Sequence, residues 1–484
     1  MTDLFAFDKP KGRVAVIGGM MAYFESIMPE GFRDDRRGHV GEVLAQLGDE
    51  FVLHELGLWA DSGDTASIAA RLKASRPDAL LFVPTMATPP ADIAALAQDA
   101  GVPVVIACAH GLSQITDDYD MRALCRHSSN VGATMMGAML SRLNLPRAPI
   151  ILAGFMDDPD FHARLRMALR TAILSRQLDG LRVGRLGNPM PGYDHVDLDV
   201  QEAQMAGVEI VDIPLETWSA RYTAVTDSEI AAFKTGRLPQ LLPEATQWSE
   251  TDNFDKAVRM AIALDRTALE YRLDCGSLTC RGPYGVELPG GAIGCLATSL
   301  MTGTGRPFSA TGDLVTAVAM LIGKALGGAT LYCELDAVDR ERDAFLVANT
   351  GEADFAWVPR NGSVTLRDAA ALSGREVPGV VIAHELAEGP ATMLGVVPDI
   401  AAGTFRLIAL EGETLEPART SLHVTHGWFR TYRCPAMSAF EDWANAGATH
   451  HGALSRGHLA EACRWLGQLT GYATKEITGR TVHD

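Results

Sequence analysis

Ala79-Leu-Leu-Phe-Val-Pro84 is the stretch that decides the fold, because it is apolar at every position and shows no alternation. A strand with one wet face alternates apolar and polar residues, whereas a strand buried on both faces is apolar throughout. Residues 13–18 (RVAVIG) and 104–107 (VVIA) repeat this pattern. Helix-favouring stretches separate the runs, among them Thr65–Ser75 and 90–99. Strands of this kind that alternate with helices predict a parallel sheet covered by helices on both faces.

The pattern restarts near residue 149 and changes character near residue 276. Strand candidates at 149–154, 181–187 and Val208–Ile213, with helix candidates at 160–178 and 253–271, predict a second unit of the same kind. Further on, Gly, Pro and Thr become frequent, and helical patterns thin out except at 313–326 and 458–470. Short runs there predict antiparallel strands of a barrel or sandwich, at 345–348, Val380–Ala383, 405–410 and 421–424.

The length of 484 residues exceeds the size at which one hydrophobic core keeps growing, so several domains are expected. The predicted fold class is α/β, with two Rossmann-like domains, each a doubly wound parallel sheet, followed by a mainly antiparallel β domain. The predicted boundaries are 1–148, 149–300 and 301–484. The third, β-barrel-like domain is expected to carry most of the active site.

Bulk properties are compatible with a soluble, cytoplasmic enzyme of neutral substrates, although many acidic proteins have no such role. A formal charge of −18 disfavours binding to nucleic acid or to an anionic membrane surface, because both need basic patches. No apolar run reaches the roughly 18–20 residues that span a bilayer, and the N-terminus lacks the apolar core of a secretory signal. The eight cysteines form no array of two close pairs, which favours reduced thiols in a reducing compartment.

Acidic side chains that could carry chemistry concentrate in the last third of the chain. Asp313 stands at a predicted helix start, where an aspartate also serves well as N-cap. Glu334 and Asp336 belong to a strand-like run, and alternation places both on one face. A carboxylate on a buried face is unusual unless it pairs or binds a metal.

Two further segments add neutral and basic groups. Asn349 and Glu352 follow the next strand, and His450-His451 stand in a predicted loop of small residues. Adjacent histidines flanked by Gly, Ala and Thr favour a ligand function over a structural one.

These segments, taken in order, resemble the C-terminal region of the L-arabinose and L-fucose isomerases. The resemblance rests on G-D-L-x-T-A-V-A-M at 312–320, C-E-L-D-A-V-D at 333–339 and T-H-H-G-A-L-S-x-G-H at 449–458. Similar stretches elsewhere extend it over about residues 12 to 475, at 13–28, 81–85, 187–194, 388–394 and 410–413.

The resemblance implies an aldose–ketose isomerase acting on a small polyhydroxylated substrate through a metal-assisted enediol. The family holds a divalent ion with carboxylates and histidines, and hard oxygen ligands with one or two imidazoles suit Mn²⁺ or Mg²⁺. Carried over by position, Glu334 is ligand and base, and the further histidine ligand falls in the His450–His451 pair, where His450 is favoured and His451 stays open. Thr311 and Asn349 occupy the positions of a glutamate and a histidine, so they are expected to contact substrate instead. Asp313 or Glu352 would then supply the partner carboxylate.

The family also implies a homo-oligomer, a hexamer or tetramer, in which the N-terminal domain of one subunit borders the active site of another. On that basis Tyr23, Arg36 and Thr85 are expected near the substrate. Two alternatives stay open at this point. One is a divergent member with altered chemistry, with or without a metal, such as a hydrolase or lyase on a non-sugar small molecule that uses Glu334 and His450 differently, with Cys333 or Cys295 nearby. The other is a non-catalytic binding protein.

Overall fold

The computed structural model describes the chain except for residues 1–3, 7–9, 144, 146, 188, 280–291, 370–377, 417–419 and 480–484. It divides into two compact units. The N-terminal unit comprises Pro10–Leu178 and Arg464–Gly471. The C-terminal unit comprises Met1–Lys9, Asp179–Cys463 and Tyr472–Asp484.

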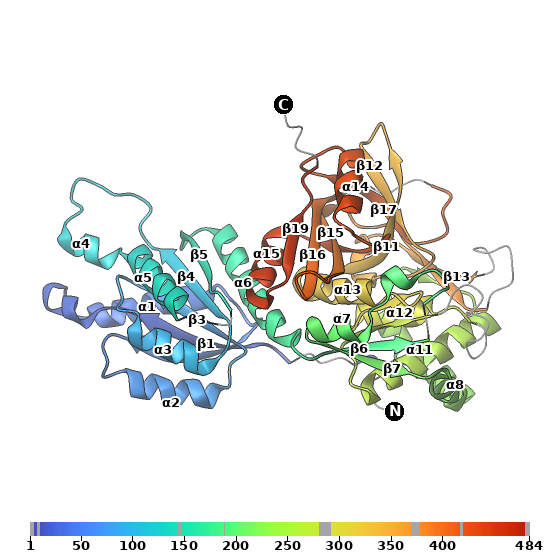
Figure 1. The fold of residues 1–484 in the computed structure, drawn as a ribbon, viewed down its shortest axis with the longest axis horizontal. Helices are drawn as coiled ribbons and strands as arrows, with labels where there is room; N and C mark the ends of the chain where they lie inside the picture. The colour runs from blue at the N-terminus through green and yellow to red at the C-terminus, as the bar shows by residue number, and fades with distance from the viewer. Residues whose placement is uncertain are drawn as a thin grey trace. The chain divides into compact units, whose positions relative to one another are not determined.

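The N-terminal unit is built on a five-stranded sheet in which every pairing is parallel (Figure 1). The strand order is β2-β1-β3-β4-β5. The strands are β1 (Arg13–Gly19), β2 (Val52–Trp59), β3 (Ala79–Pro84), β4 (Val104–His110) and β5 (Ile150–Phe155).

The three inner strands β1, β3 and β4 are buried almost throughout because helices cover both of their faces, whereas the edge strands β2 and β5 have exposed positions. On β3, Leu81 and Val83 pack in one core cluster, and Leu80 and Phe82 pack in the other. The first cluster is closed by α1 (Phe32–Ala45) and α6 (Pro159–Gln177). The second is closed by α2 (Thr65–Ser75), α3 (Ala91–Ala100) and α5 (Ser129–Arg142). The parallel sheet predicted from the apolar runs is confirmed.

The C-terminal unit combines a smaller parallel sheet with an antiparallel barrel. The parallel sheet has the order β10-β9-β6-β7, with β6 (Leu181–Leu186), β7 (Val208–Ile213), β9 (Cys275–Leu278) and β10 (Phe308–Ala310). In the barrel, six strands pair in the circuit β15-β18-β11-β12-β17-β16, and the pairing of β16 with β15 closes it. They are β11 (Thr330–Asp339), β12 (Ala344–Ala348), β15 (Gly389–Asp399), β16 (Thr404–Thr414), β17 (His426–Thr431) and β18 (His451–Arg456).

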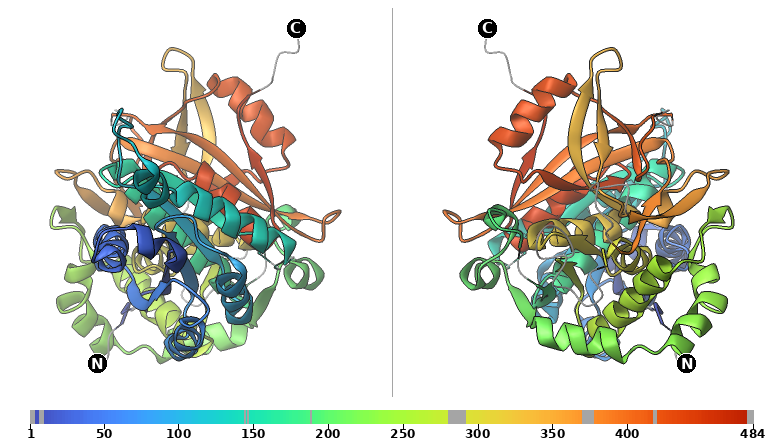
Figure 2. Two further views of the ribbon diagram at one scale, coloured as in Figure 1. Left: turned by 90° about the vertical axis from the view of Figure 1, so that its left-hand side faces the viewer. Right: turned by 90° about the vertical axis from the view of Figure 1, so that its right-hand side faces the viewer.

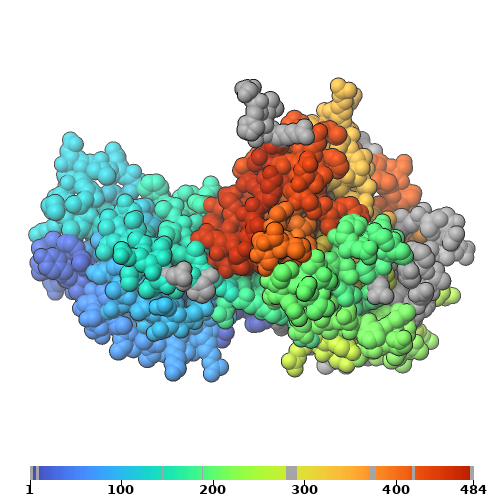
Figure 3. Space-filling model, viewed as in Figure 1, coloured from blue at the N-terminus to red at the C-terminus, as the bar shows by residue number. Residues whose placement is uncertain are grey.

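Within this unit, the tip of the β11–β12 hairpin projects beyond the rest of the barrel (Figures 2 and 3). The remaining elements are η1 (Ala22–Ile27), α4 (Met121–Arg126), η2 (Asp194–Val196), α7 (Val200–Met205), α8 (Leu215–Ala224), α9 (Asp227–Thr235), α10 (Leu238–Leu241), β8 (Thr246–Gln247), α11 (Asp252–Glu270), α12 (Cys295–Gly303), η5 (Phe355–Trp357), β13 (Val364–Asp368), β14 (Val380–Ala383), α14 (Ala436–Asn445), α15 (Ala460–Thr470) and β19 (Ala473–Glu476).

Helix α13 (Leu314–Gly327) joins the two layers of the C-terminal unit, because it contacts β6, β9 and β10 as well as the barrel strands β11, β15 and β18. Its first ten residues are all buried, which explains its strongly apolar sequence. Gly323 allows the helix to approach the barrel closely, since a Cβ there would lie 1.9 Å from Ser455 Oγ. The helix therefore fixes the position of its own N-terminus against the barrel wall.

Two predictions about elements differ from the structure. The strand predicted at 421–424 is wrong, because the strand that pairs with β12 begins at His426 and Ser421, Leu422 and His423 are exposed. The loop predicted around His450-His451 extends too far, because the strand begins within it. His451 begins strand β18, and Gly452 fits there because a Cβ would meet Met393 Sδ at 2.6 Å. Strand β5 joins the N-terminal sheet, so the boundary after residue 148 does not coincide with that between the compact units. The three-domain division and the Rossmann-like description of the parallel sheets stay predictions.

Candidate functional site

Strand pairing brings three polar side chains onto one face of the barrel wall. β11 and β18 pair so that Glu334 lies opposite His451. Tyr332 is two residues from Glu334, and side chains two apart on a strand share a face. The intervening Cys333 packs in the barrel core. Tyr332, Glu334 and His451 therefore point away from that core, on the side where α13 packs.

Asp313 and Glu334 hold the two nitrogens of the His451 ring. Asp313 Oδ2 lies 2.8 Å from Nδ1, and Glu334 Oε1 lies 3.2 Å from Nε2. The Tyr332 hydroxyl lies 2.7 Å from Nδ1. Asp313 is 0% and His451 2% exposed, whereas the Glu334 side chain is 36% exposed. A buried imidazole is thus fixed in orientation, and a carboxylate beside it remains accessible to a substrate.

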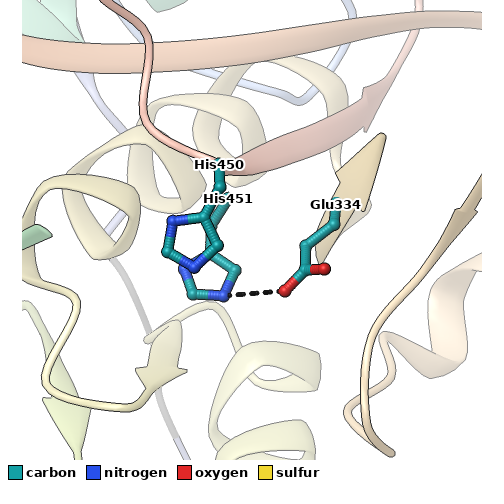
Figure 4. Close-up of side chains that lie close together, drawn as sticks. All are labelled: Glu334, His450 and His451. Carbon is teal, nitrogen blue, oxygen red and sulfur yellow. Dashed lines mark ion pairs between the residues drawn. The ribbon is translucent and has the colours of Figure 1, made fainter. Parts of the chain in front are cut away.

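His450 adds a second imidazole to this cluster. One ligand atom from each of Glu334, His450 and His451 lies within 4.8 Å of the other two. Figure 4 shows the Glu334 carboxylate directed at His451, with the His450 ring beside it. In the described part of the chain, this is the one group of three or more His, Cys, Asp or Glu side chains close enough to share an ion.

The two histidines differ in their affinity for a proton. Burial lowers the pKa of His451, but its hydrogen bonds to Asp313 and Glu334 outweigh this effect, and the pKa lies above its ordinary value. Partial burial, followed by the neighbouring His451, lowers the pKa of His450. As pH falls, His451 is therefore the first of the pair to take up a proton.

The donor set fits a divalent ion. Glu334 offers a carboxylate oxygen, and Asp313 occupies the Nδ1 side of His451, which leaves Nε2 facing Glu334. A carboxylate on the far nitrogen of a histidine is the usual outer contact of a metal-bound imidazole, since it fixes both ring orientation and tautomer. Asp313 thus lies where it would orient a ligand.

Thr311 and Asn349, which stand where the family has a glutamate and a histidine ligand, make hydrogen bonds within the protein. Thr311 donates to the carbonyl of Ala310 at 2.7 Å, and its hydroxyl lies 3.1 Å from that of Tyr332. Asn349 Oδ1 accepts from the backbone N–H of Thr350 at 2.5 Å. Thr311 therefore joins the polar cluster around His451 through Tyr332.

Glu352 lies outside the group formed by Glu334, His450 and His451. Its Oε1 accepts from the Cys295 thiol at 3.6 Å, and the carboxylate is 4% exposed. Cys333, suggested for metal-free chemistry, is fully buried, and burial raises the pKa of its thiol far above the ordinary value. A thiolate at Cys333 is therefore disfavoured.

Of the three N-terminal residues expected near the substrate, Arg36 and Thr85 contact each other in the N-terminal unit. Arg36 donates to the carbonyl of Thr85 at 3.2 Å, and both residues line a cavity of about 160 Å³ with His39, His110 and Arg126. Tyr23 is 79% exposed and is not among the lining residues. Their expected substrate contacts stay predictions.

Tyr332 was not predicted as a site residue. The sequence could have indicated it, because Tyr332 is two residues before Glu334 on a predicted strand, and residues two apart on a strand lie on the same face. Cavity size does not locate the site either. A groove of about 960 Å³ is lined by Arg342, Trp428, Arg430 and several glutamates, and it contains none of the predicted site residues.

Comparisons with known proteins give a distant similarity to a sugar isomerase. No protein-family model matches the chain. An L-arabinose isomerase from Nocardioides sp. (strain ATCC BAA-499 / JS614) is 24% identical over 381 residues, which cover 73% of this chain and 71% of the relative. This distant similarity suggests the isomerase family, and it makes an enzyme plausible. The solute-binding protein of an ABC transporter from Burkholderia multivorans aligns with 17% identity over 66% of this chain and 92% of that chain. Its TM-score of 0.14 is too low to inform on the fold.

Across the residues with described structure, no helix combines the length and the apolar character that crossing a membrane requires.

Proposed function

We propose that the chain is an isomerase that interconverts aldose and ketose forms of a small polyhydroxylated substrate. The observation that carries the proposal is the accessible Glu334 carboxylate, 3.2 Å from a His451 ring whose other nitrogen is held by Asp313. The distant similarity to an L-arabinose isomerase supports the same reaction class.

Glu334 is the proposed base. Isomerisation moves a proton from the carbon beside the carbonyl to the carbonyl carbon, and a second proton moves between the two oxygens. A carboxylate that is 36% exposed can reach a substrate carbon, take up the proton and return it to the neighbouring carbon. The fixed His451 ring restricts where this carboxylate can lie, which favours a single attack geometry.

Glu334, His450 and His451 would hold a divalent ion. When bound, such an ion stabilises the negative charge that develops on the substrate's carbonyl oxygen. Asp313 orients His451 in this scheme. Thr311 and Asn349 are proposed as hydrogen-bonding contacts of substrate hydroxyls.

Glu334→Gln tests the proposal. The amide keeps the size of the side chain but cannot accept the proton, so we expect turnover to fall by about 10²–10⁴-fold. The measurement is isomerisation of a panel of pentoses and hexoses in deuterated water, followed by loss of the hydrogen beside the carbonyl. Asp336→Asn is the matched control, because Asp336 is an exposed carboxylate on the same strand. It should keep wild-type turnover.

Unchanged turnover in Glu334→Gln would remove Glu334 as the base. A wild-type protein that exchanges no hydrogen with any aldose or ketose of the panel would contradict the proposed reaction itself.

A second candidate, acid–base chemistry without a metal, is favoured by one observation. The Tyr332 hydroxyl lies within 3.4 Å of Thr311, Asp313 and His451, so it belongs to a buried proton-transfer network. In that case Tyr332→Phe would abolish activity on a non-sugar substrate, and chelators would have no effect. Activity that chelators abolish would exclude this candidate.

A further inference from the structure

The cavity of the N-terminal unit lies where the connections of the parallel sheet diverge. β1 and β3 are neighbours in the sheet, but α1, which follows β1, packs on one face and α3, which follows β3, packs on the other. Connections that leave in opposite directions open a crevice at the carboxyl ends of the strands, and parallel sheets bind ligands in such crevices. Thr85, directly after β3, and His110, the last residue of β4, line the cavity of about 160 Å³ together with residues of α1.

We infer that this cavity binds a small oxyanion, the carboxylate or phosphate group of a ligand, between Arg126 and the N-terminus of α5. Every residue that lines the cavity belongs to the N-terminal unit, so the inference goes beyond the proposed isomerase reaction and does not depend on it. The volume of about 160 Å³ is below the roughly 300–1,000 Å³ of pockets that enclose a drug-sized molecule. It therefore suits one small group.

Two guanidinium groups of the cavity wall share one carboxylate. Asp35 Oδ1 accepts from Arg126 Nη2 at 2.6 Å, and Asp35 Oδ2 accepts from Arg36 Nε at 3.0 Å. These three side chains together carry one positive charge in excess. Glu42, the second carboxylate among the lining residues, is exposed, so solvent weakens its effect on the interior of the cavity. A bound anion would neutralise the excess charge.

The two arginines differ in what they can do for a ligand. Arg36 is 4% exposed, and its Nη1 donates to the carbonyls of Thr85 and Arg126, both at 3.2 Å. It thereby fixes the backbone on two sides of the cavity. The Arg126 side chain is 42% exposed and bonds to Asp35 through Nη2. A partly exposed guanidinium offers N–H groups in the planar arrangement that matches the oxygens of a carboxylate or phosphate.

The start of α5 adds backbone N–H donors. The first N–H groups of a helix have no partner within it and favour a negative charge. Ser128, the N-cap residue of this 14-residue helix, makes no side-chain cap bond. Its Oγ accepts from the N–H of Ala87 at 3.0 Å and donates to the carbonyl of Cys125 at 2.7 Å. Ser129, the next residue, is 3% exposed and lines the cavity, so the uncapped end of the helix borders it.

The histidines of the cavity wall indicate a positive environment and an unmet hydrogen bond. Burial, and then the charge of Arg36, lower the pKa of His39 to about 4. Burial, followed by Arg126 and Arg36, also lowers the pKa of His127. His39 Nε2 is buried and has no hydrogen-bond partner in the described part of the chain. Buried polar atoms without partners are rare in native proteins, and a ligand in the cavity would supply one.

Calorimetric titration of the full-length protein with inorganic phosphate and, separately, with acetate tests the inference. Sodium chloride of equal ionic strength is the reference, because salt screens every exposed charge. In Arg126→Ala we expect the affinity for the anion to fall at least about tenfold, since a charge-assisted hydrogen bond is lost. Arg122→Ala is the matched control. It removes the same charge from an exposed position of α4 that does not line the cavity, and it should bind like wild type.

Asp35→Asn provides a second variant with the opposite expectation. The amide removes the negative charge that competes with a ligand for both guanidinium groups, so the anion should bind several-fold more tightly. If the arginines serve only to pair with Asp35, this substitution gives no such gain. Hydrogen exchange locates the site, because peptides that span residues 121–132 should exchange more slowly when the anion is present, and peptides of the C-terminal unit should not change.

Binding of phosphate, acetate or both that depends on Arg126 supports the inference, and the anion that binds more tightly identifies the group. Affinity that is equal in wild type and Arg126→Ala would overturn it, as would the absence of binding by both anions. Slower exchange confined to the C-terminal unit would also overturn it. None of these results bears on the proposed isomerase, which is tested by sugar turnover in Glu334→Gln.

Discussion

Asp313 serves two purposes with its two carboxylate oxygens. Oδ1 accepts the backbone N–H of Thr316 at 2.8 Å and so caps α13, while Oδ2 lies 2.8 Å from His451 Nδ1. The sequence left a helix cap and a site residue as competing interpretations of this position, and the structure combines them. The start of the helix and the orientation of the imidazole are fixed by one side chain.

This double use predicts different outcomes for two substitutions. Asparagine caps helices as well as aspartate does. In Asp313→Asn, however, the amide N–H₂ can face Nδ1, which forces the ring proton onto Nε2 and blocks the nitrogen beside Glu334. We expect folding to persist and activity and metal affinity to fall by about 10–100-fold. Asp313→Ala should lose about 1 kcal/mol more stability than Asp313→Asn, because the cap is also gone.

Thermal unfolding and metal titration of both variants check this expectation. Asp313→Asn with wild-type metal affinity and activity would show that the cap is the sole function of this carboxylate.

Among the helices and strands, the bounds of strands that are apolar and buried on both faces were predicted best from the sequence. The run at β3 is buried throughout and the run at β14 is buried except at Ala383, and the predicted bounds of both agree with the structure. Helix α12 was missed because its residues are nearly all buried, so no polar face reveals the helical period. The strand β18 was taken for a loop because Gly452 and Ala453 are small for reasons of packing, which sequence composition cannot distinguish from flexibility.

The site shows the same limit. Glu334 and His451 could be proposed separately, since each is an unusual residue for its segment. Their register, which places them opposite each other on β11 and β18, depends on the pairing of strands more than a hundred residues apart and carries no local signal.

The segment after β14 makes stability depend on pH. His384 is 5% exposed, its Nδ1 lies 2.8 Å from the carbonyl of Glu385, and burial lowers its pKa from 6.5 to about 4. Between these values the unfolded chain binds a proton that the folded chain does not. Stability is therefore lost as pH falls from 6.5 towards 4, by up to about 3 kcal/mol for this group.

His384→Gln removes the imidazole that takes up this proton in the unfolded chain. Urea unfolding at pH 7.5 and pH 4.5 should show a smaller loss of stability on acidification in the variant than in wild type. His39, whose pKa is also lowered to about 4 by burial, retains its own contribution in both proteins. An identical loss in the two proteins would show that His384 is not held neutral in the folded state.

At the scale of the whole molecule, the chain returns to its first unit close to its C-terminal end. Arg464–Gly471 belongs to the N-terminal unit, although α15, which contains most of it, begins in the C-terminal unit. Leu469 is 2% exposed and packs in the cluster formed by β1, β3, β4, α1 and α6. Gln468 is exposed, and its Nε2 donates to the carbonyl of Pro149 at 2.8 Å. The N-terminal core is therefore incomplete until almost the entire chain has been synthesised.

Leu469→Ala should accordingly destabilise a unit that, apart from Arg464–Gly471, consists of residues before position 179. Truncating a fully buried leucine costs about 2–5 kcal/mol, because apolar contacts are lost and a cavity is left behind. We expect hydrogen exchange measured by mass spectrometry to accelerate in β3 and β4 of the full-length variant. Gln468→Ala, on the same helix, loses one exposed hydrogen bond and should cost no more than about 1 kcal/mol. Protection of β3 and β4 that is equal in Leu469→Ala and wild type would mean that α15 does not complete this core in solution, and that the N-terminal unit folds from residues 10–178 alone.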